Sequence, residues 1–122
     1  MNPPEAKPSS PAPTANDRRH HRRYTVHVQI EIRQERCAIP MRLQTTDLSR
    51  GGCYVELMMP LPVGARVQAT LWLGASSIVI RGRVVTCHPN FGNGIMFTEF
   101  DGQAEQLLNL YLDAVTTGTS VP

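Results

Sequence analysis

Long apolar runs are absent from this sequence. No segment approaches the ~20 consecutive apolar residues that a membrane-spanning helix requires. The first residues also lack the apolar stretch of a signal peptide, so nothing indicates export. We therefore expect a cytoplasmic protein without a membrane span.

Cysteine is also scarce, and its spacing excludes two common roles. The chain has three cysteines, Cys37, Cys53 and Cys87, which are far apart and form no CxxC pair. Neither a disulfide framework nor a structural zinc site fits this pattern, and a reducing cytoplasm suits unpaired thiols. His20 and His21 have no further ligand nearby in the sequence, so we expect solvated histidines and no metal site.

Signatures of catalysis are missing as well. The sequence has no nucleophile–base pair, no phosphate-cradling P-loop and no metal-ligand cluster, which predicts a protein that is not an enzyme and needs no cofactor. Hydrophobic residues make up 41 % of the chain and charged residues 18 %. These proportions are typical of a soluble globular protein with one domain and a single core.

Proline marks the first boundary in the chain. Five of the ten prolines fall within residues 1–16, without periodic apolar positions. Such a segment buries too little surface to offset its ordering entropy, so we predict a disordered N-terminal tail over 1–16. The folded domain is predicted to cover 17–116, followed by a flexible C-terminus over 117–122.

Alternation of apolar and polar residues predicts six strands after the tail. The first is expected to begin at Tyr24, and the others are expected at 39–47, 53–57, 66–73, 78–85 and 95–100. Only the last segment has helical periodicity, with Asp101 as the expected N-cap. The predicted fold class is therefore all-β: a six-stranded antiparallel Greek-key (split) β-barrel with one C-terminal α-helix.

A compact cationic segment precedes the first predicted strand. Residues 17–23 read Asp-Arg-Arg-His-His-Arg-Arg and carry a net charge of +3 with neutral His, whereas the whole chain carries +2. The rest of the chain therefore carries −1, so the positive charge is local. Arginine can donate to two acceptors at once, which suits phosphate groups and the O6/N7 edge of guanine.

A carboxylate, a hydroxyl and two glycines follow at residues 47–52, which read Asp-Leu-Ser-Arg-Gly-Gly. In an extended chain the side chains of Asp47 and Ser49 lie on the same side. A carboxylate can accept from guanine N1–H and N2–H, and a hydroxyl can donate or accept. Gly51 and Gly52 permit positive φ and a close approach of a ligand to the backbone. Together the two segments predict capture of a small anionic, hydrogen-bonding ligand.

The same residues also have plainer interpretations. Basic clusters are usually solvated or bind nucleic acid loosely. A D-x-S-x-x-G segment is more often a hairpin turn in which Asp or Ser satisfies local N–H groups. Trp72 fits a partial cover for the barrel as well as a base-stacking surface. Arg81 and Arg83 fit either plain surface residues or added positive charge at the site.

The conjunction of the two segments resembles a known family. Over about residues 18–112 the chain is similar to the PilZ domain, a bacterial receptor for cyclic di-GMP. The family's R-x-x-x-R motif matches residues 19–23, with Tyr24 directly after it, and its D/N-x-S-x-x-G motif matches residues 47–52. Residues 92–97, Gly-Asn-Gly-Ile-Met-Phe, are similar to the glycine-led last strand of the family.

The first motif fits this sequence in two registers. Arg18 and Arg22 have the same spacing as Arg19 and Arg23. We prefer Arg19 and Arg23, because Arg23 then adjoins Tyr24 and the first predicted strand. The resemblance implies that Arg19 and Arg23 contact guanine and phosphate.

The resemblance also implies a ligand site on the outer surface of the barrel. Asp47 and Ser49 would hold a guanine edge, and Gly51 and Gly52 would supply closely approaching backbone. In the family, an arginine just before the first motif accompanies a stacked pair of ligand molecules. Arg18 occupies that position, which implies two molecules of cyclic di-GMP per site.

The predicted function is a non-enzymatic receptor for cyclic di-GMP that signals to an unidentified partner protein. One alternative is a small barrel that binds single-stranded nucleic acid, with Trp72 or Tyr54 as stacking surfaces. Aromatic residues make up only 6 % of the chain, and no extended basic groove is evident, so nucleic acid is disfavoured. The other alternative is a PilZ-like interaction module that binds no nucleotide. Such domains generally lack the motif residues, whereas this chain keeps them.

Overall fold

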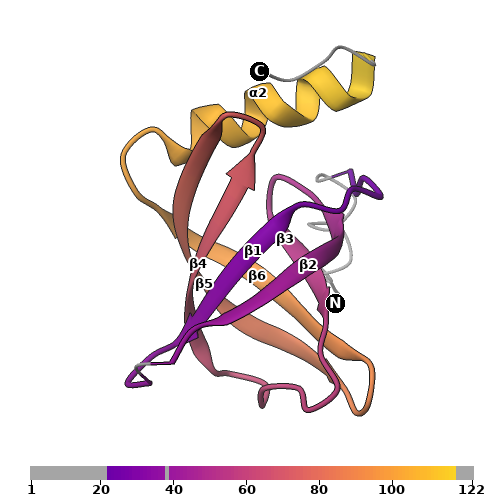
Figure 1. Ribbon diagram of the computed structural model, residues 1–122, viewed down its shortest axis with the longest axis vertical. Helices are drawn as coiled ribbons and strands as arrows, with labels where there is room; N and C mark the ends of the chain where they lie inside the picture. The colour runs from indigo at the N-terminus through magenta and orange to yellow at the C-terminus, as the bar shows by residue number, and fades with distance from the viewer. Residues whose placement is uncertain (1–21, 38, 118–122) are drawn as a thin grey trace, which may run out of the picture.

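The computed structural model describes residues 22–37 and 39–117. Arg18, Arg19 and the predicted tail over 1–16 lie outside these residues, as does the predicted C-terminal segment after residue 117. The chain forms six strands and then one helix (Figure 1). Their bounds are β1 Gln29–Gln34, β2 Met41–Leu48, β3 Gly52–Glu56, β4 Arg66–Leu73, β5 Ser76–His88, β6 Gly92–Phe100 and α2 Ala104–Thr117.

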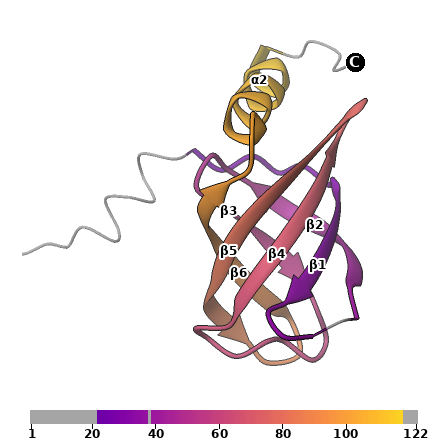
Figure 2. The same cartoon turned by 90° about the vertical axis from the view of Figure 1, so that its left-hand side faces the viewer.

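The strands close into a barrel in the order β1-β2-β3-β6-β5-β4, with every neighbouring pair antiparallel. The connection from β3 to β4 returns the chain to the free side of β1, so that β4, β1, β2 and β3 form a Greek key. The predicted fold class is therefore confirmed, with the ring of strands closed. Helix α2 lies across one end of the barrel, and the β1–β2 turn lies at the opposite end (Figures 1 and 2).

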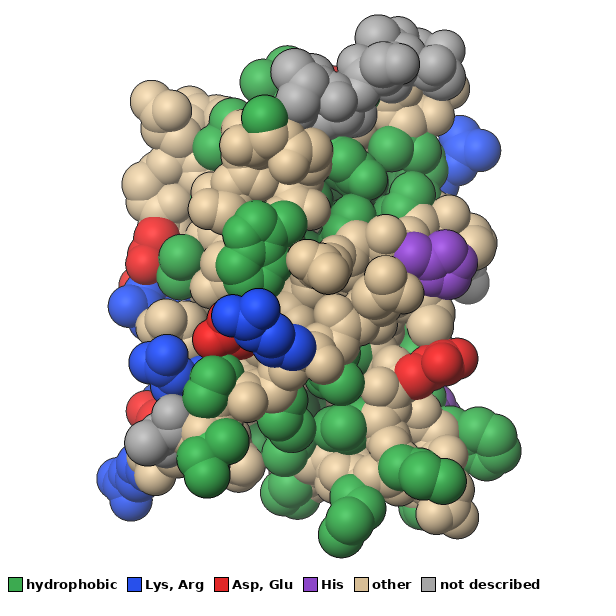
Figure 3. Space-filling view, in the orientation of Figure 1, with side chains coloured by type: hydrophobic (Ala, Val, Ile, Leu, Met, Phe, Trp, Pro, Cys, Tyr) green, Lys and Arg blue, Asp and Glu red, His purple; other side chains and the backbone are tan. Residues whose placement is uncertain are grey.

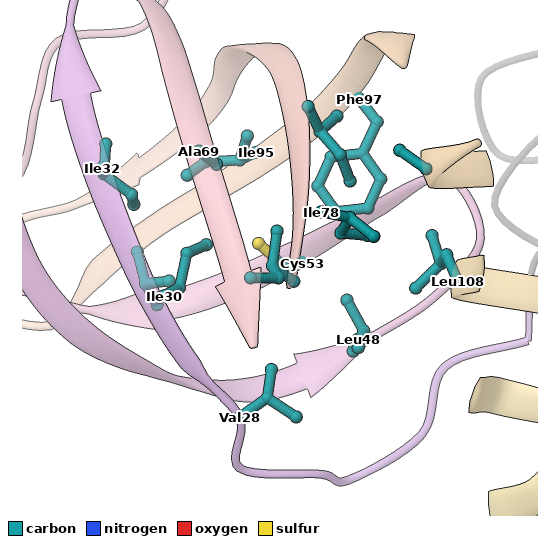
Figure 4. Packing of buried hydrophobic residues seen from close by; sticks show 14 of the residues in the cluster. Val28, Ile30, Ile32, Leu48, Cys53, Ala69, Ile78, Ile95, Phe97 and Leu108 are labelled. Atoms are coloured by element: carbon teal, nitrogen blue, oxygen red, sulfur yellow. The ribbon is translucent and has the colours of Figure 1, made fainter. Parts of the chain in front are cut away.

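The interior of the barrel is filled by alternate residues of the strands, because successive side chains in a strand point to opposite faces. Leu108 and Leu112 of α2 close the end of this core and are fully buried. Figure 4 shows how side chains from several strands meet there. The buried cluster includes Val28, Ile30, Ile32, Leu48, Cys53, Val55, Val67, Ala69, Leu71, Ile78, Ile80, Val84, Ile95 and Phe97.

The first strand begins later than its alternation predicts, at Gln29 instead of Tyr24. The buried side chain of Thr45 in β2 is the reason. Its Oγ1 donates to the carbonyl of Val26 at 2.7 Å and accepts from the N–H of Val28 at 3.1 Å. A side chain thus takes backbone partners that a regular ladder would use, so the segment before Gln29 follows β2 with isolated backbone hydrogen bonds and no continuous ladder.

The expected helix N-cap was also wrong. Helix α2 begins at Ala104, and Gly102, with a positive φ of 54°, separates it from Asp101. The carboxylate of Asp101 accepts a hydrogen bond from Nη1 of Arg81 at 2.7 Å. Its backbone carbonyl accepts from the N–H of Ala104 at 2.9 Å. Asp101 therefore supports the helix start through its backbone, while its carboxylate is engaged by β5.

Candidate functional site

The segment before β1, residues 22–28, is called the arm here and crosses the end of the barrel that α2 covers (Figure 2). Tyr24 and Leu48 exchange two backbone hydrogen bonds of 2.9 Å, which fix the arm to the end of β2. The hydroxyls of Tyr24 and Thr116 are hydrogen-bonded at 2.9 Å, which joins the arm to α2. The arm is therefore in contact with both the barrel and the helix.

The structure brings the two motifs together at Arg23 and Asp47. Nη1 of Arg23 lies 3.5 Å from Oδ2 of Asp47, although 24 residues separate them in the chain. The two side chains are 56 % and 27 % exposed, so water screens the pair and its contribution to stability is small. A ligand can therefore replace this ion pair at little cost in stability.

The neighbouring Arg22 has a different environment. Its guanidinium carbon lies 5.4 Å from the centre of the Tyr24 ring, within the range of a cation–π contact. Arg22 thus packs on the arm itself, whereas Arg23 faces Asp47. This arrangement favours the motif register of Arg19 and Arg23, of which the structure describes only Arg23.

The Ser49 side chain forms hydrogen bonds within the turn that follows β2. Its side chain is buried, and its Oγ accepts from the N–H groups of Gly51 and Gly52, both at 3.1 Å. The same oxygen donates to the carbonyl of Gly52 at 3.2 Å. This is the plainer interpretation of the motif, in which the hydroxyl satisfies local N–H groups. A guanine contact by Ser49 stays a prediction, and it would compete with these bonds.

Gly52 is required by the barrel itself. It pairs with Met96 of β6, and a Cβ on Gly52 would overlap the backbone oxygen of Ile95. The positive φ that glycine permits is not used at Gly51 or at Gly52, which is the first residue of β3. Among the described residues, glycines with positive φ are Gly64, Gly74, Gly92 and Gly102. The backbone that lies close to Gly52 is thus that of β6.

Arg50 links the turn to the helix. Its Nη2 lies 2.6 Å from Oδ1 of Asp113 in α2. Sequence reasoning missed this ion pair, because its partners are 63 positions apart and nothing local connects them. The turn over residues 47–52 and the arm therefore each have one polar contact with α2.

Two titratable side chains, Cys53 and Tyr54, follow the turn directly. Cys53 is buried, and its burial raises the pKa of the thiol to about 12, with a further increase from the Asp47 carboxylate that Arg23 opposes. The thiol therefore stays protonated and unreactive. Desolvation, with smaller contributions from Cys87, Glu56 and Asp47, raises the pKa of Tyr54 above its usual value.

Tyr54 lies beside the candidate site. It is the cross-strand partner of Asp47, so both side chains are on one face of the sheet. Its hydroxyl is hydrogen-bonded to Nδ1 of His88 at 2.9 Å. Alternation along β3 is the sequence signal that could have placed this ring on the same face as Asp47.

Trp72, Arg81 and Arg83 have other surroundings. Trp72 is 38 % exposed and pairs with Ser77 beside the β4–β5 hairpin. Arg81 forms ion pairs with Asp101 and Glu99, at 2.7 and 3.7 Å. In the described chain, no hydrogen bond or ion pair joins any of these three residues to Arg23 or Asp47.

Residues 22–37 and 39–117 contain neither a metal-binding cluster nor a membrane-spanning helix. No cluster of three His, Cys, Asp or Glu side chains has a metal-binding arrangement there. None of the helices in this part of the chain has the length and apolar character needed to traverse a bilayer.

Several solved structures share this fold. The inhibitor of motility MotI/DgrA of Bacillus subtilis superposes with a TM-score of 0.66 at 16 % identity, covering 80 % of this chain and 51 % of that one. This chain thus spans about half the length of that relative. The PilZ domain of CeSA from a cellulose-synthesizing bacterium gives a TM-score of 0.61 at 19 % identity, with 78 % and 98 % covered.

A third similar structure is the PilZ domain of YcgR from Escherichia coli with c-di-GMP. Its TM-score is 0.55 at 13 % identity, and 82 % of this chain and 90 % of that chain are covered. At such identities these likenesses show the fold alone. No curated protein matches the sequence.

The family is identified from the sequence. The PilZ domain pattern matches residues 17–114, which include the arm, both motifs, all six strands and most of α2. The match thus covers most of the chain, and it agrees with the closed barrel and with the meeting of the two motifs at Arg23 and Asp47. This chain belongs to the PilZ domain family.

Proposed function

We propose that this chain is a non-enzymatic receptor for cyclic di-GMP, which binds where the arm meets the turn over residues 47–52. The observation that carries this proposal is the 3.5 Å approach of Arg23 to Asp47. It unites a cation and an acceptor from two distant motifs at one exposed place. The YcgR domain, a member of the same fold family, was solved with c-di-GMP, which supports the choice of ligand.

The chemistry of the pair matches the chemistry of the ligand. A guanine offers acceptors at O6 and N7 and donors at N1–H and N2–H, and each phosphodiester adds a negative charge. Arg23 donates to the acceptor edge or to a phosphate, and Asp47 accepts from the donor edge. The ligand replaces one screened ion pair by several charge-assisted hydrogen bonds, which are stronger.

The expected number of bound molecules follows from the arginines that precede the arm, which lie outside the described residues. Arg19 would supply a second guanidinium for the same ligand. In the family, an arginine just before the first motif accompanies a stacked pair of ligand molecules, and Arg18 occupies that position, so we expect two molecules of cyclic di-GMP at the site. A planar guanidinium suits stacking on a purine as well as bidentate donation.

The signal leaves the site through α2. The arm contacts α2 through Tyr24 and Thr116, and the turn contacts it through Arg50 and Asp113. A ligand that draws the arm and the turn together changes both contacts and so the surface that a partner protein meets. The three cysteines are free, which suits the reducing cytoplasm where we place this exchange.

Calorimetric titration with cyclic di-GMP tests the proposal. Wild-type protein should give saturable heat with two ligands per chain, and Arg23→Ala should lower the affinity at least tenfold. Arg42→Ala is the matched control, because Arg42 is 84 % exposed on β2 and pairs with Glu31 at 3.8 Å. Equal affinity of the Arg23→Ala and Arg42→Ala proteins would contradict the proposed site.

A nucleotide-independent interaction module is the second candidate, and two observations favour it. The barrel itself accounts for Ser49, through the hydrogen bonds of the turn, and for Gly52, through the close approach of β6. These motif residues are therefore explicable without a ligand. If folded wild-type protein gives no heat with cyclic di-GMP at concentrations that detect micromolar binding, this candidate replaces the first.

A further inference from the structure

A second concave surface lies on β1, β4, β5 and β6 and reaches the β1–β2 turn, at the end of the barrel opposite α2 (Figure 1). The hollow has a volume of about 780 Å³. In Figure 3 blue side chains gather along the left edge of the molecule, where these strands lie. The charged residues that line the hollow are Arg33, Arg36, Arg66, Arg81, Arg83, Glu35 and Glu99, with a net charge of +3. We call it the arginine hollow.

The strand register explains how these side chains come to one face. Arg33 is opposite Gln68, which is opposite Arg81, which is opposite Glu99. A second row contains Arg66 opposite Arg83. Directly opposed residues on neighbouring strands point to the same face of a sheet, so both rows face outward into the hollow.

The pair Arg66 and Arg83 is electrostatically unfavourable. Like charges directly opposite each other destabilise a sheet. Within the described ranges, no carboxylate lies at ion-pair distance from either side chain, and the same holds for Arg33 and Arg36. Among the described arginines of the hollow, Arg81 alone has its charge balanced by ion pairs, which it forms with Asp101 and Glu99. An anionic partner in the hollow would remove this repulsion.

Arg36, which also lines the arginine hollow, has a strained backbone conformation. It has a φ of 68°, in a turn closed by a 2.9 Å hydrogen bond from the N–H of Cys37 to the carbonyl of Gln34. Residues with a side chain rarely adopt positive φ, and Gly or Asn is preferred in such turns. The turn therefore presents an arginine to the hollow where a glycine would be less strained.

The surroundings of the arginines narrow the class of partner. None of the described residues that line the hollow is aromatic, so they offer nucleic-acid bases no stacking surface. Arginine is enriched at protein–protein interfaces, and its guanidinium suits carboxylates.

We propose that the arginine hollow is a docking surface for an acidic, extended segment of a partner protein. Arg81 and Arg83 are two positions apart in β5, so the rows are separated by about 7 Å along the strand. Alternate side chains of an extended peptide have this same spacing. A segment with Asp or Glu at every second position therefore pairs with both rows at once. The surface is separate from the Arg23–Asp47 site and does not depend on the proposed nucleotide.

Fluorescence anisotropy with a labelled ten-residue peptide of alternating Glu and Ser tests this proposal at low salt. Full-length wild-type protein should bind the peptide saturably. The double variant Arg33→Ala, Arg66→Ala should bind it at least tenfold more weakly, whereas Arg42→Ala should bind it as wild type does. Circular dichroism melts and the cyclic di-GMP heat of each variant show whether the barrel is intact.

The outcomes are distinguishable from those of the nucleotide proposal. Equal losses in the double variant and in Arg42→Ala would show diffuse electrostatic attraction and overturn the docking surface. Tighter binding of a ten-nucleotide single-stranded DNA, weakened by the same double variant, would assign the hollow to nucleic acid and also overturn it. Absence of saturable peptide binding by protein that binds cyclic di-GMP would overturn the hollow alone.

Discussion

The guanidinium of Arg50 lies 2.6 Å from the carboxylate of Asp113, so a salt bridge joins the turn over residues 47–52 to α2. Arg50 is the residue between the serine and the glycines of the second motif. A ligand that displaced this turn would therefore act on the helix through a direct contact.

The Arg50–Asp113 pair should affect communication more than stability. The two side chains are 36 % and 64 % exposed, so a double-mutant cycle with Arg50→Ala and Asp113→Ala should give a coupling free energy of roughly 0.2–1 kcal/mol in urea unfolding. In the Asp113→Ala protein, cyclic di-GMP should cause smaller amide shift changes in α2 than in wild type. Unchanged shifts in α2 would contradict the proposed route.

Asp47 and Ser49 should separate ligand binding from folding. Asp47→Asn removes a partly exposed carboxylate, so it should weaken cyclic di-GMP binding at least tenfold and change the free energy of unfolding little. Ser49→Ala leaves the N–H groups of Gly51 and Gly52 without their acceptor and should destabilise the protein by about 1–3 kcal/mol. Titration and urea unfolding of both variants check this contrast. The opposite pattern would mean that Ser49 serves the ligand.

Gly52→Ala should destabilise the barrel strongly. Its Cβ would overlap the backbone oxygen of Ile95, which cannot move without disrupting the β3–β6 pairing, so we expect a loss of about 3 kcal/mol or more. Gly102→Ala is the control, because that site has open space and only a positive φ of 54°. Its cost should be about 1–2 kcal/mol. Equal costs in thermal unfolding would contradict the role given to β6.

The buried thiol of Cys53 predicts a loss of stability in alkali. Its pKa rises from 9.0 to about 12 on folding, so above pH 9 the unfolded chain releases a proton that the folded chain retains. The stabilisation is complete below pH 9 and is lost as the pH rises toward 12, by roughly 1.4 kcal/mol at pH 10. Cys53→Ala should flatten this part of the stability profile in urea unfolding. An unchanged slope would exclude Cys53 as the cause.

Relief of the repulsion between Arg66 and Arg83 should stabilise the barrel. Arg83→Gln should raise the free energy of unfolding by roughly 0.2–1 kcal/mol at low salt, because the like-charge pair is removed. The gain should vanish near 1 M salt, where screening acts over about 3 Å. Arg33→Gln is the control, since Arg33 is opposite a neutral Gln68. An equal gain in both variants would point to net charge instead of the pair.

Local patterns located all six strands, but β5 (Ser76–His88) and β6 (Gly92–Phe100) are longer than the predicted 78–85 and 95–100. The alternation at Val67, Ala69, Leu71 and Leu73 predicted β4 with its observed bounds. Alternation did not predict where β1 begins. The residues before Gln29 also alternate, but the Thr45 side chain forms hydrogen bonds with their backbone that a paired strand would otherwise form. The side chain that replaces the ladder belongs to another strand, so the segment itself carried no sign of it.

In the candidate site, too, some features follow from local motifs and others depend on residues far away in the sequence. The two motifs were predicted to hold one ligand between them, and the structure places Arg23 of the first motif 3.5 Å from Asp47 of the second. The reason for Gly52 depends on Ile95, and the partner of Arg50 is Asp113. Such long-range contacts follow from the barrel order, which a single motif does not reveal.

Closure of the barrel restricts the ways in which a partner can recognise this protein. Each described strand has two paired neighbours in the ring, so no strand has a wholly unpaired edge of backbone N–H and C=O groups. A partner therefore finds little room to extend the sheet with a strand of its own, as many peptide ligands do. Recognition must depend on side chains, and single charge substitutions on the outer face should be enough to change which proteins bind.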